Sequence, residues 1–427
     1  MTKQKISIRL YQLLILLLVP ILLLVLIVRS FSQKEYRQRL SERFGWLPSN
    51  MQPGGIVVHA ASVGEVIAAK PFIDKLLLTY PKLPITVTTF TPTGSAQVKK
   101  FYIDKVQHCY LPLDISFCVH LFFRLLKPKA VVLMETELWP TLIHRCYKSD
   151  VKLLLINARL SAKSLNSYKK LSWIITPALN KFSAILCQSN DNVEHFIEIG
   201  ANTDLVSNSG NLKYDIGVTD ELQQKVSELQ QFVPEQRRLL VLGSTHQGEE
   251  LPVLNAYKQL KDNNPELLLV LVPRHPERFS SVTKLCAEQG FNAVTRSSQQ
   301  AISEDTDIWL IDTLGELLAV YALAEVCMVA GSFSDVGGHN PLEPALFAKP
   351  IVVGENMANF KEITQKLIDA NGIVQLEKNS ELAVKLHCLL TDYELATSIG
   401  KNAYDVVIAN QGATDRSIDA LTDILNL

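Results

Sequence analysis

Short runs of apolar, mostly β-branched residues alternate with amphipathic segments from Gly55 onward. The apolar runs are continuous rather than alternating with period two, which predicts strands buried on both faces of a parallel sheet. The amphipathic segments at 65–80 and 115–127 predict helices that cover this sheet. The predicted strands of this first set span 55–62, 85–90, 106–112, 130–137, 151–159 and 184–189.

The alternation stops at 216–237, where a polar, Gln-rich stretch predicts a linker with one surface helix. It resumes in a second set of strands at 238–245, 267–275, 307–312, 326–332 and 350–355. The pattern therefore predicts an α/β protein with two doubly wound, Rossmann-like lobes, over 55–215 and 238–427. Because ligands bind beyond the carboxyl ends of such strands, we expect the site in a cleft where the two lobes face each other.

The segment 10–28 is apolar except for Gln12, and as a helix it would be about 28 Å long, close to the thickness of a bilayer core. It predicts a single transmembrane helix, after a short stub at 1–9 on the cytoplasmic or periplasmic side. A cleaved signal peptide would have a shorter apolar region and a small-residue cleavage site, whereas Arg29 follows here. The basic residues of the linker at 29–54 favour a cytoplasmic location of the body that follows the helix. The linker itself either lies on anionic lipid headgroups or is an ordinary solvated segment.

Composition narrows the function classes. The net charge of −1 does not suggest a nucleic-acid partner. The seven cysteines form no CxxC pair, which favours reduced, buried thiols. The nine histidines lack metal-ligand spacing, and Asp305-Thr306-Asp307 precedes a predicted strand, so we read it as a solvated loop. We therefore predict no essential metal and no cofactor.

Polar residues follow several strands of the first lobe. Ser62-Val63-Gly64-Glu65 fits a helix capping box, and it also fits a general base at the cleft. Glu135 and Glu137 end a buried run, where two carboxylates are costly unless they are paired or used, and strand alternation puts both on one side. Arg159 is a candidate cation, and Lys213 is either a solvated surface group or a cleft residue near the hinge.

The second lobe has the same arrangement. Gly243–Gly248 lies between a strand and a helix, where backbone N–H groups suit a phosphate. Arg274 offers a planar donor fork for a phosphate or a base. The turn 312–316 fits a second capping box. Glu343 follows a Gly-Gly turn and either stabilises a helix N-terminus or accepts ribose hydroxyls.

Taken together, these segments resemble the 3-deoxy-D-manno-octulosonic acid (Kdo) transferases, a family with the GT-B glycosyltransferase fold. The resemblance is collinear and covers nearly the whole chain. The matching strings are ERFG (42–45), HAASVGE (59–65), TPTG (91–94), METELWP (134–140), NARLS (157–161), GNLKYD (210–215), PRHPERF (273–279), DTLGEL (312–317) and GGHNPLEPA (337–345).

The resemblance implies an inverting transfer of Kdo from CMP-Kdo to the lipid A precursor, lipid IVA, in lipopolysaccharide synthesis. Glu65 would accept the proton of the acceptor hydroxyl, and Glu135 and Lys213 would stabilise the transition state. The cytosolic donor implies a single-pass inner-membrane protein of Gram-negative bacteria, with its body against the inner leaflet on the cytoplasmic face. The implied CMP-binding residues are Pro273, Arg274, Leu314 (in place of the commoner Met), Gly315, Glu316, Asn340, Pro341, Leu342 and Glu343.

Two alternatives stay open. Another membrane-associated GT-B protein, such as a lipid-linked N-acetylglucosamine transferase or a sugar-nucleotide epimerase, would share the lobes but not the order of these strings. A membrane-anchored, two-lobed solute-binding protein would not be an enzyme, and it would carry an external body with a lipobox or cleavage site.

Overall fold

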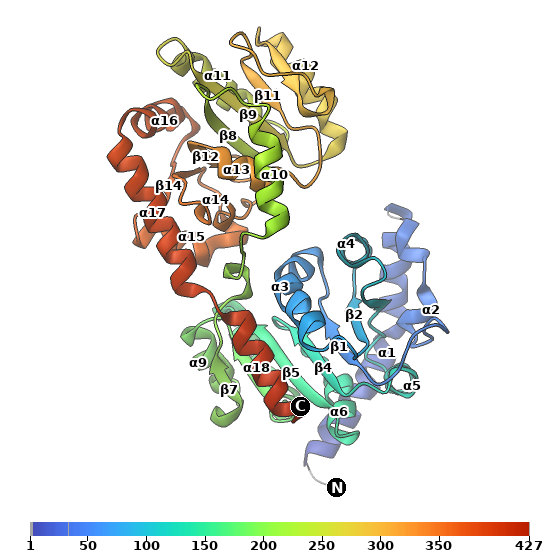
Figure 1. Ribbon diagram of the computed structural model, residues 1–427. Helices are drawn as coiled ribbons and strands as arrows, with labels where there is room; N and C mark the ends of the chain where they lie inside the picture. Colours follow the sequence, from blue (N-terminus) through green and yellow to red (C-terminus); the bar gives the residue numbers. More distant parts are fainter. Residues whose placement is uncertain (1–2, 33, 427) are drawn as a thin grey trace. The chain divides into compact units, whose positions relative to one another are not determined.

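The computed structural model describes residues 3–32 and 34–426, which form two compact units (Figure 1). The first unit holds the chain up to Asp215 together with the segment from Gln411 onward, and the second spans Ile216–Asn410. The assignment of 238–427 as a whole to the second lobe is therefore wrong at its C-terminal end. Helix α18, Ala413–Leu425, lies against α3, Val63–Thr79, and buries Ile418 and Leu421 in the core of the first unit.

The first unit is built on a parallel sheet in the order β3-β2-β1-β4-β5-β6-β7. Its strands are β1 Ile56–His59, β2 Ile85–Thr89, β3 Gln107–Tyr110, β4 Ala130–Met134, β5 Lys152–Ala158, β6 Ala184–Cys187 and β7 Val206–Asn208. Besides α3 and α18, its helices are α1 Lys3–Ser32, α2 Leu40–Arg43, α4 Pro92–Tyr102, α5 Ser116–Leu126, α6 Pro140–Lys148, α7 Ala162–Lys170, α8 Ser172–Leu179 and α9 Asn190–Glu198.

The second unit has a parallel sheet in the order β10-β11-β9-β8-β12-β13-β14. Its strands are β8 Arg238–Thr245, β9 Leu267–Pro273, β10 Ala293–Thr295, β11 Ile308–Leu310, β12 Val326–Val329, β13 Ile351–Val353 and β14 Val374–Gln375. Its helices are α10 Asp220–Gln230, α11 Glu250–Lys261, α12 Phe279–Glu288, α13 Leu317–Leu323, α14 Leu342–Ala345, α15 Lys361–Asp369, α16 Leu382–Thr391 and α17 Tyr393–Asn410.

Neighbouring residues of a strand enter different cores. In β1, Ile56 and Val58 pack into the core under α3 and α18, whereas Val57 packs into the core under α5 and α6. This confirms the parallel sheets inferred from continuous apolar runs. The hydrophobic pattern did not predict three strands, β7, β10 and β14. Each of them is an edge strand of its sheet and has two or three residues.

The N-terminal segment differs from the sequence-based prediction. Among the residues that the structure describes, no helix has both the length and the apolar character that crossing a membrane requires. The single transmembrane helix predicted over 10–28, and with it a single-pass inner-membrane topology, is not supported. Helix α1 contacts α6 and α8 of the first unit, and the Tyr11 hydroxyl donates a 3.0 Å hydrogen bond to Asp114.

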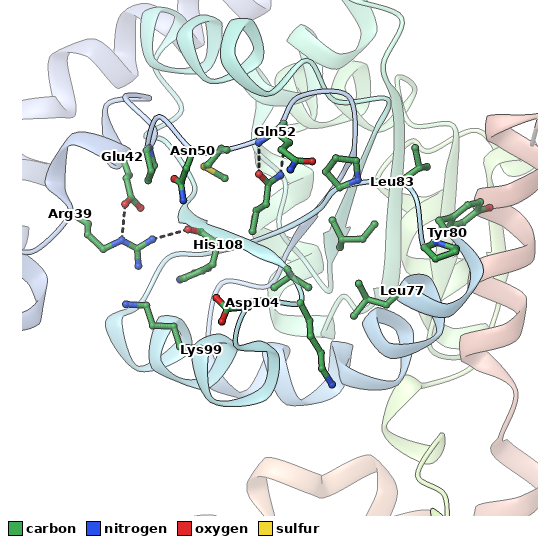
Figure 2. A pocket seen from close by; sticks show the side chains of 18 residues that line it. Arg39, Glu42, Asn50, Gln52, Leu77, Tyr80, Leu83, Lys99, Asp104 and His108 are labelled. Atoms are coloured by element: carbon green, nitrogen blue, oxygen red, sulfur yellow. Dashed lines mark hydrogen bonds and ion pairs between the residues drawn. The ribbon is translucent and has the colours of Figure 1, made fainter.

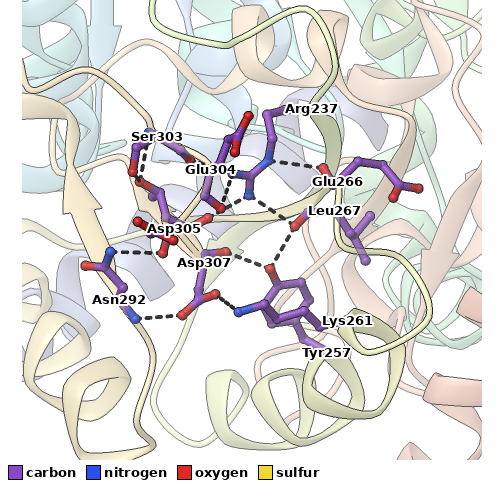
Figure 3. A network of polar contacts seen from close by, with 11 residues as sticks. Arg237, Tyr257, Lys261, Glu266, Leu267, Asn292, Ser303, Glu304, Asp305 and Asp307 are labelled. Atoms are coloured by element: carbon purple, nitrogen blue, oxygen red, sulfur yellow. Dashed lines mark hydrogen bonds and ion pairs between the residues drawn. The ribbon is translucent and has the colours of Figure 1, made fainter.

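The predicted solvated loop at 305–307 is also corrected (Figure 3). Asp307 is buried, pairs with Lys261 and accepts the backbone N–H of Asn292 at 2.8 Å. Beside it, the buried Arg237 guanidinium donates to backbone carbonyls, including those of Ser303 at 2.7 Å and Thr306 at 2.6 Å. These contacts lie where β9 and β11 begin, so the Asp-x-Asp sequence stabilises the fold at the edge away from the strands' carboxyl ends.

Candidate active site

Glu65 lies on the first turn of α3, just beyond the carboxyl end of β1. Its carboxylate accepts the backbone N–H of Ala61 and the hydroxyl of Ser62, each at 2.9 Å. Ser62 also caps α3, because its side chain accepts the backbone N–H of Glu65. The capping interaction expected from the sequence is therefore present. It does not use up the carboxylate, since each of its oxygens retains acceptor capacity.

The pKa of Glu65 is raised to about 7, mainly by burial and also by the nearby charges of Glu137 and Glu135. The hydrogen bonds from Ala61 and Ser62 oppose this shift but do not cancel it. A carboxylate with this pKa exists in both protonation states near neutral pH. It is therefore suited to accept a proton from a hydroxyl group.

Glu135 and Glu137 follow β4, but not as parts of a strand. The strand ends at Met134, and Glu135 has a left-handed backbone with φ 51°. The alternation that placed both carboxylates on one side therefore does not apply. Glu137 accepts the indole N–H of Trp139 at 2.6 Å. Its Oε2 also lies 3.6 Å from Nε2 of His59.

His59 holds Glu137 in its ionised form. Burial favours a neutral Glu137, but the nearby His59 ring and the hydrogen bond from the Trp139 indole together lower the pKa of Glu137. The other ring nitrogen of His59 lies 3.0 Å from the Thr88 hydroxyl, on the neighbouring strand β2. The sequence predicts no role for His59, because a histidine inside an apolar strand has no signal that separates it from a core residue.

Lys213 lies on a short 3₁₀ segment, Leu212–Tyr214, that contacts α3. The buried side chain of Asn157, at the end of β5, accepts the backbone N–H of Leu212 at 3.1 Å. Asn211 accepts the backbone N–H of Lys213 at 3.0 Å and donates to Gln188 at 3.0 Å. These amide contacts connect the Lys213 segment to the carboxyl ends of β5 and β6, so the structure brings Lys213 and Glu65 to the same edge of the sheet.

In the second unit, Arg274 follows β9, and its backbone N–H donates to Thr245 at 3.1 Å. Burial raises the pKa of Glu343 to about 7, while the Arg274 charge and a hydrogen bond with Asn340 oppose that rise. Asn340 also accepts the backbone N–H of Leu342 at 3.2 Å. The structure therefore brings Arg274, Asn340 and Glu343 together, on both sides of the central strand β8.

The turn 314–316 makes its side-chain contacts with residues other than Arg274, Asn340 and Glu343. Glu316 lies 3.4 Å from Arg296 and accepts the Thr313 hydroxyl. Leu314 is exposed, and Gly315 has φ 90°, which favours glycine. The second capping box does not form, because α13 has no side-chain cap and Asp312 instead accepts the backbone N–H of Ser297 at 2.8 Å.

A cavity away from these residues lies elsewhere in the first unit (Figure 2). Its volume is about 840 Å³, and its lining includes Arg39, Tyr80, Lys99 and Gln107. It extends past Pro84 and Ile85, where β2 begins, and none of the predicted site residues lines it. Because ligands of such sheets bind at the carboxyl ends, we do not assign this cavity to the active site.

Comparisons with known proteins identify the family of this chain. Residues 38–216 match the family model described as 3-deoxy-D-manno-octulosonic-acid transferase (kdotransferase). The chain is 38% identical over 418 residues to the 3-deoxy-D-manno-octulosonic acid transferase of Haemophilus influenzae, covering 97% of this chain and 98% of that protein.

Two solved structures share the fold. The UDP-GlcNAc 2-epimerase of Neisseria meningitidis has a TM-score of 0.58 and 14% identity, covering 87% of this chain and all of that one. A glycosyltransferase of Rickettsia africae has a TM-score of 0.54 and 14% identity, covering 87% and 99% of the two chains. At these identities the likeness concerns the fold alone, and it confirms a GT-B-like pair of α/β domains.

Proposed function

This chain belongs to the 3-deoxy-D-manno-octulosonic acid (Kdo) transferase family and transfers Kdo in lipopolysaccharide synthesis, and on this basis we propose its substrates and its stereochemistry. The donor is CMP-Kdo, and the acceptor is the lipid A precursor lipid IVA. The transfer inverts the configuration at the anomeric carbon. The observation that carries the mechanism is the carboxylate of Glu65, at the end of β1, with its pKa raised to about 7. An inverting transfer needs one base to take the proton of the attacking hydroxyl.

In this mechanism, the acceptor oxygen forms a bond to the anomeric carbon of Kdo while Glu65 takes its proton. The bond from that carbon to the phosphate oxygen breaks, and its electron pair stays on the phosphate of CMP. Glu135 and Lys213, at the same sheet edge as Glu65, stabilise the charges that develop. Lys213 is suited to offset negative charge on the Kdo carboxylate or on the phosphate.

We assign CMP to the second unit. Arg274 provides a guanidinium for the phosphate or the base, and Glu343 accepts ribose hydroxyls beside Asn340. Pro273, Pro341 and Leu342 shape these turns, and the turn Leu314-Gly315-Glu316 contributes through its backbone. The absence of a side chain at Gly315, which has φ 90°, supports such a backbone contact, because a ligand can approach a glycine backbone closely.

We further propose that the first unit acts at the cytoplasmic leaflet of the inner membrane. Helix α1 supports this proposal by its exposed apolar side chains, among them Leu13, Leu17 and Phe31, which are 54%, 67% and 74% exposed. Such side chains are suited to contact lipid at the surface of a bilayer that presents the acceptor.

Mass spectrometry of the reaction products tests the function directly. Purified protein, CMP-Kdo and a tetraacylated lipid A precursor should yield a product heavier by one or more Kdo residues. Replacing CMP-Kdo with UDP-N-acetylglucosamine provides a matched control that should give no transfer. If the lipid stays unmodified with CMP-Kdo, or is modified from the UDP-sugar, the proposal is wrong.

A further inference from the structure

Three histidines gather at the carboxyl ends of β8, β9 and β12. Nε2 of His246 lies 2.8 Å from Nε2 of His339, and their nearly coplanar rings meet edge to edge, with centroids 5.1 Å apart and planes 9° apart. The ring of His275 meets His246 edge-on, with centroids 5.4 Å apart. His246 and His339, which we call the histidine pair, come from loops 93 positions apart in the sequence.

A buried carboxylate holds the two loops of the histidine pair together. Glu249 is fully buried and accepts the backbone N–H groups of His246 and Gly331, each at 2.9 Å. It also accepts the backbone N–H of Phe333 at 3.0 Å and the hydroxyl of Ser334 at 3.1 Å. A carboxylate with four donors is a rigid connection, so the position of the histidine pair is built into the fold.

The ring of His339 packs directly on the backbone at Gly331. A β-carbon at Gly331 would lie 2.9 Å from the imidazole, and the φ of 73° also favours glycine there. The Nε2–Nε2 distance identifies the contact as a hydrogen bond with one shared proton. Two nitrogens bound to one tetrahedral zinc ion at ~2.0–2.1 Å would lie roughly 3.3 Å apart.

The surroundings of the histidine pair are rich in cations. The pKa of His339 is lowered to about 4, mainly by burial and also by the charges of Arg274, His246 and His275. Burial also lowers the pKa of His246, where His275, Arg278 and Arg274 act in the same direction and Glu249 opposes them. Two other carboxylates lie nearby: Glu250 pairs with Arg278, and Glu343, whose pKa burial raises to about 7, is only partly ionised at neutral pH. In the absence of an anion, the histidine pair is therefore neutral at pH 7.

We propose that the histidine pair binds the phosphate of CMP and takes up one proton when that phosphate arrives. This inference rests on the proposed function, in which CMP binds beside Arg274. A neutral, hydrogen-bonded imidazole pair has one free ring nitrogen on each residue, and an anion beside it favours the protonated form. After this uptake the pair holds three protons, one shared between the two Nε2 atoms and one on each Nδ1, and both Nδ1–H groups can donate to the phosphate without displacing Arg274.

The proton balances the charge that transfer creates. In CMP-Kdo the phosphate is a diester with one negative charge, and cleavage of the bond to the anomeric carbon leaves CMP with a second charge. The acceptor's proton goes to Glu65 in the first unit, so it is not the proton that offsets this second charge. The histidine pair has already taken its proton from solvent when the phosphate binds, and the resulting positive charge stabilises the leaving group as the bond breaks.

Isothermal titration calorimetry of the full-length protein with CMP tests this inference. Titrations at pH 7 in buffers of different ionisation enthalpy give the number of protons taken up on binding. The wild-type protein should take up about one proton more than His246→Gln or His339→Gln, and each variant should bind CMP on the order of tenfold more weakly. Cytidine, which lacks the phosphate, should bind equally to all three proteins.

His387→Gln, in an exposed part of α16, is the matched control and should behave as the wild type. Equal proton uptake by the wild type and the pair variants would overturn the inference, and so would an equal loss of cytidine binding, which would indicate only a structural role. Failure of CMP to bind the wild-type protein would instead overturn the assignment of CMP to the second unit.

Discussion

Nε2 of His59 lies 3.6 Å from Oε2 of Glu137, beside the base-bearing end of β1. This contact keeps Glu137 negatively charged, and that charge in turn raises the pKa of Glu65. A positioning residue outside the predicted set therefore tunes the proposed base.

Replacing Glu137 with Gln removes a negative charge near Glu65. The pKa of Glu65 should fall, and the acid limb of the profile of kcat/KM against pH should move to lower pH. Asp150→Asn, on a side chain that is 94% exposed in the same unit, should leave the profile in place. An unchanged acid limb in Glu137→Gln would show that this charge does not act on the base.

Replacing Glu65 with Gln keeps a group that can accept from Ala61 and Ser62 but removes the base. Transfer should fall by roughly 10²–10⁴-fold, with CMP affinity unchanged, because CMP is assigned to the other unit. The rate of Kdo transfer and CMP titration by calorimetry measure the two effects. Activity within about tenfold of the wild type would exclude Glu65 as the base.

The same substitution, which should lower activity, should raise the stability of the folded protein at alkaline pH. A carboxyl whose pKa is raised from 4.5 to about 7 favours the folded state below pH 4.5, and this advantage is lost as the pH rises through 7. Above that pH, the folded protein bears an ionised, partly desolvated carboxylate. At pH 8, Glu65→Gln should therefore have a higher free energy of unfolding than the wild type, by up to roughly 3 kcal/mol, and should unfold at a higher temperature. At pH 4 the two proteins should differ little in stability.

Thermal melts of both proteins at the two pH values measure this effect. A variant that is less stable than the wild type at pH 8 would contradict a raised pKa at Glu65.

Arg274→Ala should weaken CMP binding by about 10- to 100-fold, because a guanidinium contributes charge-assisted hydrogen bonds to a phosphate. The substitution should also raise the pKa of Glu343 further, since the Arg274 charge now lowers it. Lys401→Ala, a side chain 73% exposed on the same unit, is the control. Equal CMP affinity of Arg274→Ala and the wild type would place the nucleotide elsewhere.

Arg237→Lys should destabilise the second unit by roughly 2–4 kcal/mol without touching the proposed site. The guanidinium satisfies several backbone carbonyls from different loops, which a lysine ammonium cannot do in one geometry. Urea unfolding measures the loss, and Lys284→Ala, 78% exposed on α12, is the control. Similar unfolding midpoints for Arg237→Lys and the control would show that these contacts contribute little.

Much of the fold could be predicted because burial on both faces of a sheet leaves a continuous apolar run. Strand β8 spans Arg238–Thr245, the range expected from its run. Strand β14 has only two residues, both partly exposed, and it is too short to be predicted from the hydrophobic pattern of the sequence. Helix α18 was assigned to the wrong unit, because its amphipathic pattern indicates that it packs but not against which sheet.

The sequence by itself determined the two parallel sheets, the residues that follow their strands and, through the order of its motifs, the Kdo transferase family. These depend on local periodicity and on strings of neighbouring residues. Only the tertiary structure decided that Glu65 has a raised pKa, that Asp307 is buried, that Glu249 joins two loops and that His246 meets His339. Each of these properties arises from groups far apart in the chain, and burial and Coulombic interaction depend on distances that a sequence does not contain.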